Sequence, residues 1–564
     1  MTNEPRTSSA GLGEQLKSFG KTFWIANFVE MLERLAYYGL RTVLPIFMIL
    51  SVEQGGPQFD HLQKGFIFAW WALIQSMIPV FTGGYADRYG YKLTVGISIA
   101  VKMVGYMVMG FAIEIAGLLT GGESLKTPGD TTTLYVFCAG AWLLALGTAI
   151  FKPGIQGILA HQLNEENEST GWAVFYQIVN VGGFLGPFLA GVLRVLAWRY
   201  VFVACAVIVA LNYILLLTFP EPPKEDGSEE QSGTWTDAIK VLWNGAIGIC
   251  EPRLLSFLVI FSGFWFMFNQ LFDMLPNYID QWVDTSGPFK VWAMFLPTAE
   301  EWNGQLPQEM MINLNAGMIM LTAFAFGYLT GKVRSMVAML LGIFVSAAAI
   351  YSIGASTNGW VVLGCIALFS VGEMSASPTK LRYFASIAPP GKKGMYLGYI
   401  NATNGFGWYV GSLVAGELYQ EKGDIFVLGR RYLESLGMAA KDVHKDVLPQ
   451  TEVLPTIAEK AGIAVNEVQM LLYNTYSPQQ IWPYFASIGL VSMFGLILFD
   501  QVTRRDLAFE PFVLLALTFA VAFYSYGLFY AVLFTVPMVF YIILHHAAPG
   551  WLPKGQSDAS EGDL

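Results

Sequence analysis

Six polar residues in the first apolar segment are spaced so that they share one face of a helix. They lie at intervals of three, four, seven, eight and eleven residues from the first and are Glu30, Glu33, Arg34, Tyr37, Tyr38 and Arg41. The surrounding run is long enough to cross a bilayer, where each buried charge costs about 3 kcal/mol or more. Four ionisable groups at that depth indicate a pathway for protons or polar solutes. The alternative is that Arg34 only neutralises the glutamates as a structural ion pair.

The elements that position these residues are predicted to be membrane-spanning helices. Hydrophobic residues make up 54% of the chain and charged residues 13%, against about 25% charged in a typical soluble domain. The net charge of −10 comes from acids concentrated in loops and in the C-terminal tail, which does not favour nucleic acid as a partner. The composition therefore predicts an all-α polytopic membrane protein that retains its first apolar run as a span.

Apolar segments suggest two sets of six spans. The first set lies near 22–50, 64–86, 93–119, 133–153, 172–196 and 199–219, and the second near 252–279, 310–331, 335–355, 360–379, 394–419 and 481–500. Basic pairs follow the even-numbered spans: Arg88 with Lys92, Lys332 with Arg334, Lys380 with Arg382, Lys392 with Lys393, and Arg504 with Arg505. The positive-inside rule then predicts a cytoplasmic N-terminus and a multi-pass location in the cell (inner or plasma) membrane.

These spans divide the chain into six segments. We expect an N-terminal bundle over 1–219, a cytoplasmic linker over 220–250, spans seven to eleven over 251–420, an extracytoplasmic helical insert over 421–479, span twelve over 480–503, and an extra membrane segment with a polar tail over 504–564. The apolar stretch 510–546 fits either one span or a hairpin. A weak repeat supports a duplicated architecture, because GGYADRYGYK follows the second span and GYLTGKVR follows the eighth.

Enzyme signatures are lacking in the sequence. We find no nucleophile elbow or phosphate loop, and the five histidines are scattered, so we expect no catalytic residue, no metal site and no cofactor. The four cysteines, Cys138, Cys205, Cys250 and Cys365, lie in or beside apolar segments and are expected to be free thiols.

Four motifs give the chain a specific resemblance. The string from Glu30 to Arg41 resembles the ExxERFxYYG signature, with its following arginine, of the proton-dependent oligopeptide transporters of the major facilitator superfamily, and Leu35 stands where the family usually has Phe. Phe151-Lys152-Pro153 resembles the FKP motif, Phe175 to Gly182 resembles FYxxIN-G, and Gly372-Glu373 with Ser377-Pro378 resembles GE-xxSP. GGYADRYGYK is the general superfamily loop. The resemblance covers about the first 420 residues and implies two six-helix bundles that alternate access to a central site.

The resemblance also implies roles in proton coupling. Glu30, Glu33 and Arg34 would form with Lys152 a charge network that links proton movement to substrate binding, whereas a lysine at the end of an apolar run could also snorkel to the interface. In the seventh span the family often carries an acid before Gln, where this chain has Asn269. Asp273 lies one helical turn further on and is the candidate substitute.

A peptide zwitterion needs one site for its carboxylate and another for its ammonium group. Arg41 and Lys152 are candidates for the carboxylate, and Glu373, alone in the tenth span, for the ammonium group. Further substrate-binding candidates are Tyr37, Tyr38, Asn180 and Asn315. Packing is the simpler explanation for the two tyrosines, and a protonated structural acid is the simpler one for Glu373.

Asp87 and Arg88 are candidates for gating, or simply mark the cytoplasmic side. The function predicted is proton-coupled symport of di- and tripeptides or peptide-like solutes by alternating access. Two alternatives remain open: transport of a non-peptide solute, and a structural role in which the insert or the C-terminal extension docks a protein partner of a larger membrane complex.

Overall fold

Helices make up nearly all the secondary structure in the computed structural model. It describes residues 12–122, 127–164, 166–222, 252–387 and 393–505. Among these residues the only strand-like pairing is one isolated bridge between Asp284 and Asn358. Eight described helices are long and apolar enough to cross a membrane, and a bent pair within 308–331 makes a ninth if it is one span.

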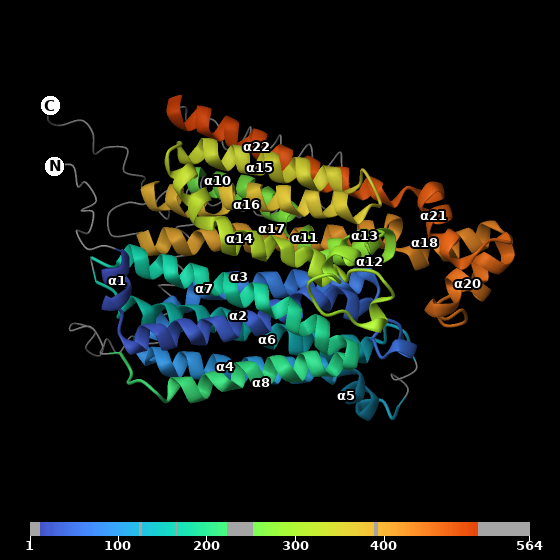
Figure 1. Cartoon of the computed structure of the whole chain (residues 1–564), viewed down its shortest axis with the longest axis horizontal. Coiled ribbons are helices and arrows are strands. Elements are labelled where there is room, and N and C mark those ends of the chain that lie inside the picture. Colours follow the sequence, from blue (N-terminus) through green and yellow to red (C-terminus); the bar gives the residue numbers. More distant parts are fainter. Residues whose placement is uncertain (1–11, 123–126, 165, 223–251, 388–392, 506–564) are drawn as a thin grey trace, which may run out of the picture.

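Two layers of long helices lie side by side, one from each half of the chain (Figure 1). The N-terminal half contains α2 (Lys21–Ile49), α3 (His61–Tyr89), α4 (Tyr91–Gly110), α6 (Thr131–Ala160), α7 (Glu168–Leu196) and α8 (Trp198–Leu216). The C-terminal half contains α10 (Pro252–Phe268), α11 (Gln270–Asp273), α12 (Leu275–Trp282), α14 (Gln308–Gly331), α15 (Ser335–Ile353), α16 (Gly359–Ile387), α17 (Lys393–Lys422) and α22 (Ile481–Arg505). Shorter helices are α1 (Leu12–Ser18), α5 (Ala112–Leu119) and α13 (Ser286–Trp292).

Two expected spans are interrupted. The third ends at Gly110, and α5 continues after a break at Phe111, whose backbone leaves the helical region. The seventh is divided into α10, α11 and α12, and Pro276 stands in the first turn of α12. Because proline has no backbone N–H, it leaves the carbonyl four residues earlier without its helical partner. That carbonyl belongs to Phe272, and it lies at the interface between the halves.

Glycines allow the two halves to approach closely along α3 and α17. A Cβ added at Gly65 would lie 2.5 Å from the carbonyl oxygen of Ser412, and one added at Gly416 would lie 2.5 Å from that of His61. Any larger side chain would collide with backbone at these two positions. The helices therefore touch through their main chains beside the polar contacts described below.

The segment after α17 forms a small helical unit, here called the insert. It contains α18 (Ile425–Ser435), α19 (Ala440–Val443), α20 (Gln450–Ala461) and α21 (Val465–Tyr476). The last two of these helices, α20 and α21, are separated at Gly462, which has a φ of +67°. The insert protrudes from one end of the molecule, here called the insert end, opposite the end that carries α1 (Figure 1). The C-terminal segment 506–564 and most of the linker, 223–251, lie outside the described residues.

Candidate functional site

A cluster of buried charges lies on α2. The Nε atom of Arg34 lies 2.9 Å from Glu30 Oε1 and 2.5 Å from Glu33 Oε2. All three side chains are about 5% exposed or less. The second carboxylate oxygen of Glu30 has no hydrogen-bond partner among the described residues. The four-residue spacing of Glu30 and Arg34 on one helix face explains why a single guanidinium reaches both acids.

Lys102 of α4 joins this cluster and was not among the sequence candidates. It is fully buried, and its ammonium group pairs with Glu33 Oε1. The signal was present in the sequence, because a charge in the middle of an apolar span follows the same rule that singled out Glu373.

Three further charges lie on helices of both halves. Lys152 of α6 is half-buried, interacts electrostatically with the α2 acids, and makes no ion pair within 4 Å among the described residues. Glu373 of α16 is half-buried and accepts a hydrogen bond of 2.8 Å from Asn315 of α14. Lys380 lies within electrostatic range of both Glu373 and Lys152. Two cations and one anion therefore come together from opposite halves.

Lys380 differs from its expected place as a cytoplasmic marker. It is 8% exposed within α16, and its ammonium nitrogen lies 3.8 Å from the centre of the Trp265 ring. A cation–π contact is stronger when the cation is desolvated, so this contact offsets part of the cost of burying the Lys380 ammonium group. Lys380 is thus a second residue that the sequence reasoning missed.

The aromatic and amide candidates have mixed environments. Tyr37 is buried and donates a hydrogen bond of 2.9 Å to Gln75, whereas Tyr38 is half-buried and lies within electrostatic range of Glu373. Asn315 also donates to Ser370 at 3.0 Å. Asn180 donates to the carbonyl of Tyr176 in its own helix at 2.7 Å. Of these residues, Asn315 and Tyr38 come nearest to Glu373.

Arg41 and Asp273 form an ion pair between the halves. Arg41 Nη2 contacts Asp273 Oδ1, and the guanidinium lies between the rings of Phe68 and Trp408, at 4.3 and 4.9 Å from their centres. Asp273 Oδ2 accepts hydrogen bonds from Trp408 at 2.8 Å and from Ser412 at 2.7 Å. In this conformation the Arg41 guanidinium is therefore bound by protein groups and links the two halves.

The break at Pro276 supplies further contacts across this interface. The carbonyl of Phe272 accepts a hydrogen bond of 3.3 Å from Arg41 Nη1. Lys64 of α3 donates to the carbonyl of Asp273 at 3.0 Å and also bonds the side chain of Asn277. The Asn277 amide in turn donates to the carbonyl of Pro45 at 3.0 Å. A broken helix thus offers polar groups that an intact one would have used internally.

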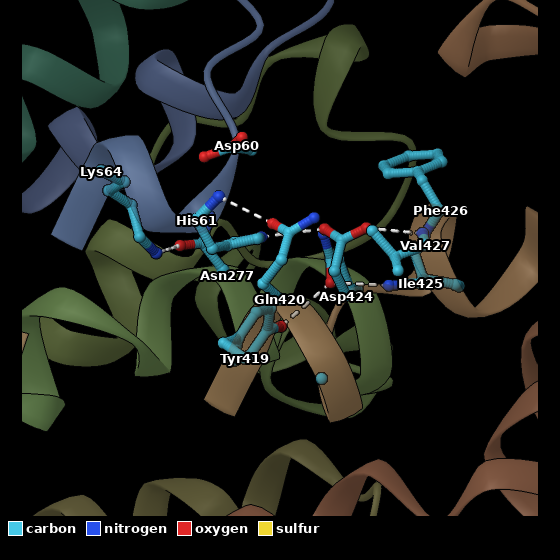
Figure 2. Close-up of polar contacts among 12 residues, drawn as sticks. Asp60, His61, Lys64, Asn277, Tyr419, Gln420, Asp424, Ile425, Phe426 and Val427 are labelled. Atoms are coloured by element: carbon cyan, nitrogen blue, oxygen red, sulfur yellow. Dashed lines mark hydrogen bonds and ion pairs between the residues drawn. The ribbon is translucent and has the colours of Figure 1, made fainter. Parts of the chain in front are cut away.

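Figure 2 shows a second contact between the halves, centred on Asp424. His61 Nε2 donates to Asp424 Oδ2 at 2.9 Å, and the His61 backbone N–H donates to Gln420 at 2.9 Å. Gln281 of α12 donates to the same Asp424 oxygen at 3.0 Å. The other Asp424 oxygen accepts from the N–H groups of Phe426 and Val427 and so caps α18. One carboxylate joins α3, α12 and the insert.

The remaining candidates take little part in these contacts. The backbone of α3 extends through Asp87 and Arg88, but their side chains lie outside the described residues. Asn269, which lies between α10 and α11, donates to the carbonyl of Trp265 at 2.7 Å. Cys138, Cys205 and Cys365 are free thiols, and Cys250 lies outside the described residues. No group of three metal-ligating side chains occurs within the described ranges.

The sequence matches the profile of the Major Facilitator Superfamily over residues 26–412. Curated relatives include the Bacillus subtilis (strain 168) "Uncharacterized transporter YclF", 26% identical over 29% of this chain and 30% of the relative. "Dipeptide and tripeptide permease B" of Yersinia enterocolitica is 28% identical over 43% of this chain and 45% of its own length. "Multidrug resistance protein MdtH" of Photorhabdus laumondii is 21% identical over 72% and 88%. The alignments with the first two thus span less than half of those relatives.

Solved structures share the fold. A POT family transporter in complex with 5-aminolevulinic acid has a TM-score of 0.58 at 15% identity and covers 88% of this chain and all of its own. A mutant of the peptide transporter POT in complex with alafosfalin has a TM-score of 0.56 at 17% identity over 88% and 99%. The expected fold of two six-helix bundles is confirmed by these matches, as is the expectation of a transporter rather than an enzyme.

Proposed function

This chain belongs to the Major Facilitator Superfamily of membrane transporters, and we propose that it couples the uptake of a small peptide or peptide-like solute to protons. The similarity to a dipeptide and tripeptide permease and to structures of peptide transporters supports this substrate class. The four sequence motifs that resemble the oligopeptide transporters support it independently.

The observation that carries the proposal is the arrangement of unpaired and paired charges on facing helices. Lys152 has no ion-pair partner within 4 Å among the described residues, and it lies within electrostatic range of Lys380 of the other half. Two cations of this kind suit a carboxylate. Glu373 accepts a hydrogen bond from Asn315 on one oxygen, and its negative charge would attract an ammonium group. The two ends of a zwitterion would thus be held by different halves, which would draw the halves together.

Protons would act through the acids of α2 and through Asp273. Breaking the buried pair of Arg41 and Asp273 by removing one partner costs about 3–5 kcal/mol, so the insert end stays closed while the pair is intact. Protonation of an acid in either cluster weakens its hold on the neighbouring cation. Proton binding and the opening of one end would therefore be linked, as alternating access requires.

Uptake into proteoliposomes tests the proposal. We expect an imposed inward proton gradient to drive accumulation of a labelled dipeptide, and Glu30→Gln to abolish this accumulation while exchange between equal internal and external pools persists. Glu53→Gln, at an exposed glutamate of a short 3-10 turn, is the matched control and should behave like the unaltered protein. Gradient-driven accumulation that survives Glu30→Gln would contradict a role for the α2 acids in coupling.

The solute is tested by competition in the same vesicles. Dipeptides, tripeptides and 5-aminolevulinic acid should reduce uptake of the label, whereas nitrate should not. The similarity to a multidrug resistance protein over 72% of this chain makes a lipophilic cation the informative fourth competitor. Transport of that cation without any peptide uptake would replace the peptide proposal, and a folded chain that moves none of these solutes would favour the docking role.

A further inference from the structure

We propose that Lys102 is a positioning residue for proton coupling, which keeps Glu33 ionised and leaves Glu30 as the α2 carboxylate that exchanges its proton. This inference rests on the proposed function only for its link to transport. The assignment of the two acids stands on their contacts alone and is tested without a substrate.

The fold provides a dedicated place for the Lys102 side chain between α4 and α6. A Cβ added at Gly147 would lie 2.6 Å from Lys102 Cγ, so the glycine makes room for the aliphatic stem. The ammonium nitrogen lies 4.1 Å from the centre of the Phe151 ring, and its tip reaches Glu33. Lysine loses substantial side-chain entropy and solvation on burial, so a fully buried lysine persists only where specific contacts compensate.

The contacts divide the two acids of α2 into unequal sites. Glu33 is paired on one oxygen with Lys102 and on the other with Arg34 at 2.5 Å. Glu30 pairs only with Arg34 among the described residues, at 2.9 Å, and the Oε2 atoms of both acids are buried without a hydrogen-bond partner there. A carboxylate between two cations resists protonation more than one that is paired with a single cation. The incoming proton should therefore bind Glu30.

The same contacts explain why Lys152 is available. Lys102 neutralises Glu33 and Arg34 neutralises Glu30, so the cluster needs no third cation. Lys152, half-buried on α6, makes no ion pair within 4 Å among the described residues and lies within electrostatic range of Lys380 of the other half. Without Lys102, Glu33 would compete with the solute for Lys152. The two lysines thus have separate roles: Lys102 pairs with Glu33, and Lys152 is available to bind an anion.

Infrared difference spectroscopy of the purified chain tests the inference directly. Acidification without any solute should produce a protonated-carboxyl band that Glu30→Gln removes and Glu33→Gln retains. Lys102→Met should add a second band, and this band should disappear in the double variant Glu33→Gln with Lys102→Met. Lys92→Met, on the same helix as Lys102 but bonded through its ammonium group to the carbonyl of Phe219, is the matched control and should add no band. Loss of the original band in Glu33→Gln, or no new band in Lys102→Met, would overturn the proposal.

A transport measurement distinguishes a positioning role from general damage. Lys102→Met should lose gradient-driven uptake, and the double variant with Glu33→Gln should recover it, because both charges of the pair are then removed together. Failure of the double variant to recover, with its infrared band intact, would show that Lys102 itself contacts the proton or the solute and would overturn the positioning role. If Lys102→Met does not fold, Glu30→Gln and Glu33→Gln still decide which of the two acids takes up the proton, and loss of the band in Glu33→Gln would overturn the proposal. Absence of uptake in the unaltered chain would reject the proposed function and leave the infrared assignment standing.

Discussion

Single residues in this protein differ in how far the sequence predicts their surroundings. Glu373 was recognisable because it is the only acid in the expected span 360–379, and the same argument applied to Lys102, in the middle of the expected span 93–119, would have found it. Sequence could not predict that Lys102, rather than Lys152, pairs with Glu33, because this depends on how α4 is rotated against α2. The same holds for Lys380, whose position at the end of a span suggested the cytoplasm although its ammonium group lies over Trp265.

Glu373→Gln should weaken the binding of solutes that carry an ammonium group. An uncharged amide keeps a hydrogen bond to Asn315 but loses the charge, and a hydrogen bond to a charged group contributes about 1.5–3 kcal/mol. We therefore expect KM for an unmodified dipeptide to rise about 10- to 100-fold. An N-acetylated dipeptide, which has no ammonium group, is the control and should show no comparable rise. Equal effects on both solutes would place Glu373 outside the ammonium site.

At the scale of elements, the interrupted seventh span was predictable in part. Pro276 was visible in the expected span 252–279 and marks the start of α12. The use of the freed carbonyl was not predictable, because Phe272 meets Arg41, a residue more than two hundred positions away. The insert was predicted as a helical unit, but its attachment through Asp424 to His61 depends on a contact between distant segments.

Asp424 should link the stability of α18 to pH. Burial would raise the pKa of its carboxyl, but hydrogen bonds from His61, Gln281 and the Val427 N–H outweigh this, and the pKa is lowered. A lowered pKa in the folded state contributes stability above the unfolded value of about 3.9, and this stability is lost as the pH falls through the folded value. The protection of the α18 amides from hydrogen exchange, measured relative to an unfolded chain at the same pH, should therefore be high at neutral pH and fall only under acidic conditions.

Two substitutions separate the roles of Asp424. Asn caps helices about as well as Asp, so Asp424→Asn should keep the cap of α18 but remove the acid-dependent change in exchange. Asp424→Ala should also lose about 0.5–2 kcal/mol of capping stability and speed exchange at neutral pH. Acid-dependent exchange that persists in Asp424→Asn would assign the effect to another group.

The interface between α3 and α17 gives a further prediction at this scale. Gly416→Val should force the helices apart at the insert end, because its Cβ would lie 2.5 Å from the His61 carbonyl oxygen. We expect a cysteine introduced at Gln420 to become reactive toward a water-soluble maleimide in this variant. Gly364→Val is the control, since a Cβ there meets no atom within 4 Å. Unchanged reactivity in Gly416→Val would mean that the interface accommodates the larger side chain without separating.

At the scale of the whole molecule, ion pairs and hydrogen bonds between the halves gather near the insert end. They include Arg41 with Asp273, Lys64 with Asn277, His61 with Asp424, and Arg194 with Glu309. The two-bundle fold followed from composition, span spacing and motifs, because these reflect the requirements of a bilayer. Which end is closed did not follow from them, because the same sequence must support both states.

Asp273→Asn should shift the population of states toward one open at the insert end. The variant loses the ion pair between the halves, but its side-chain amide can still accept a hydrogen bond from Ser412. The substitution should therefore weaken the interface without disturbing the local packing of α11. Spin labels at the exposed Glu114 and Glu300, one in each half, should be farther apart in Asp273→Asn than in the unaltered protein, as measured by double electron–electron resonance. Asp500→Asn is the matched control, because its pair with Arg334 lies within one half. Similar distance distributions in both variants would contradict a gating role for Asp273.

The contacts of the insert depend on how the two halves are arranged. Both of its ends connect to the C-terminal half, yet Lys445 donates a hydrogen bond of 3.3 Å to the carbonyl of Pro128 in the N-terminal half. Any movement that opens the insert end must separate these two groups. A nanobody selected to touch both would grip an epitope that exists in only one state, and would arrest the transport cycle from outside the membrane-spanning bundle.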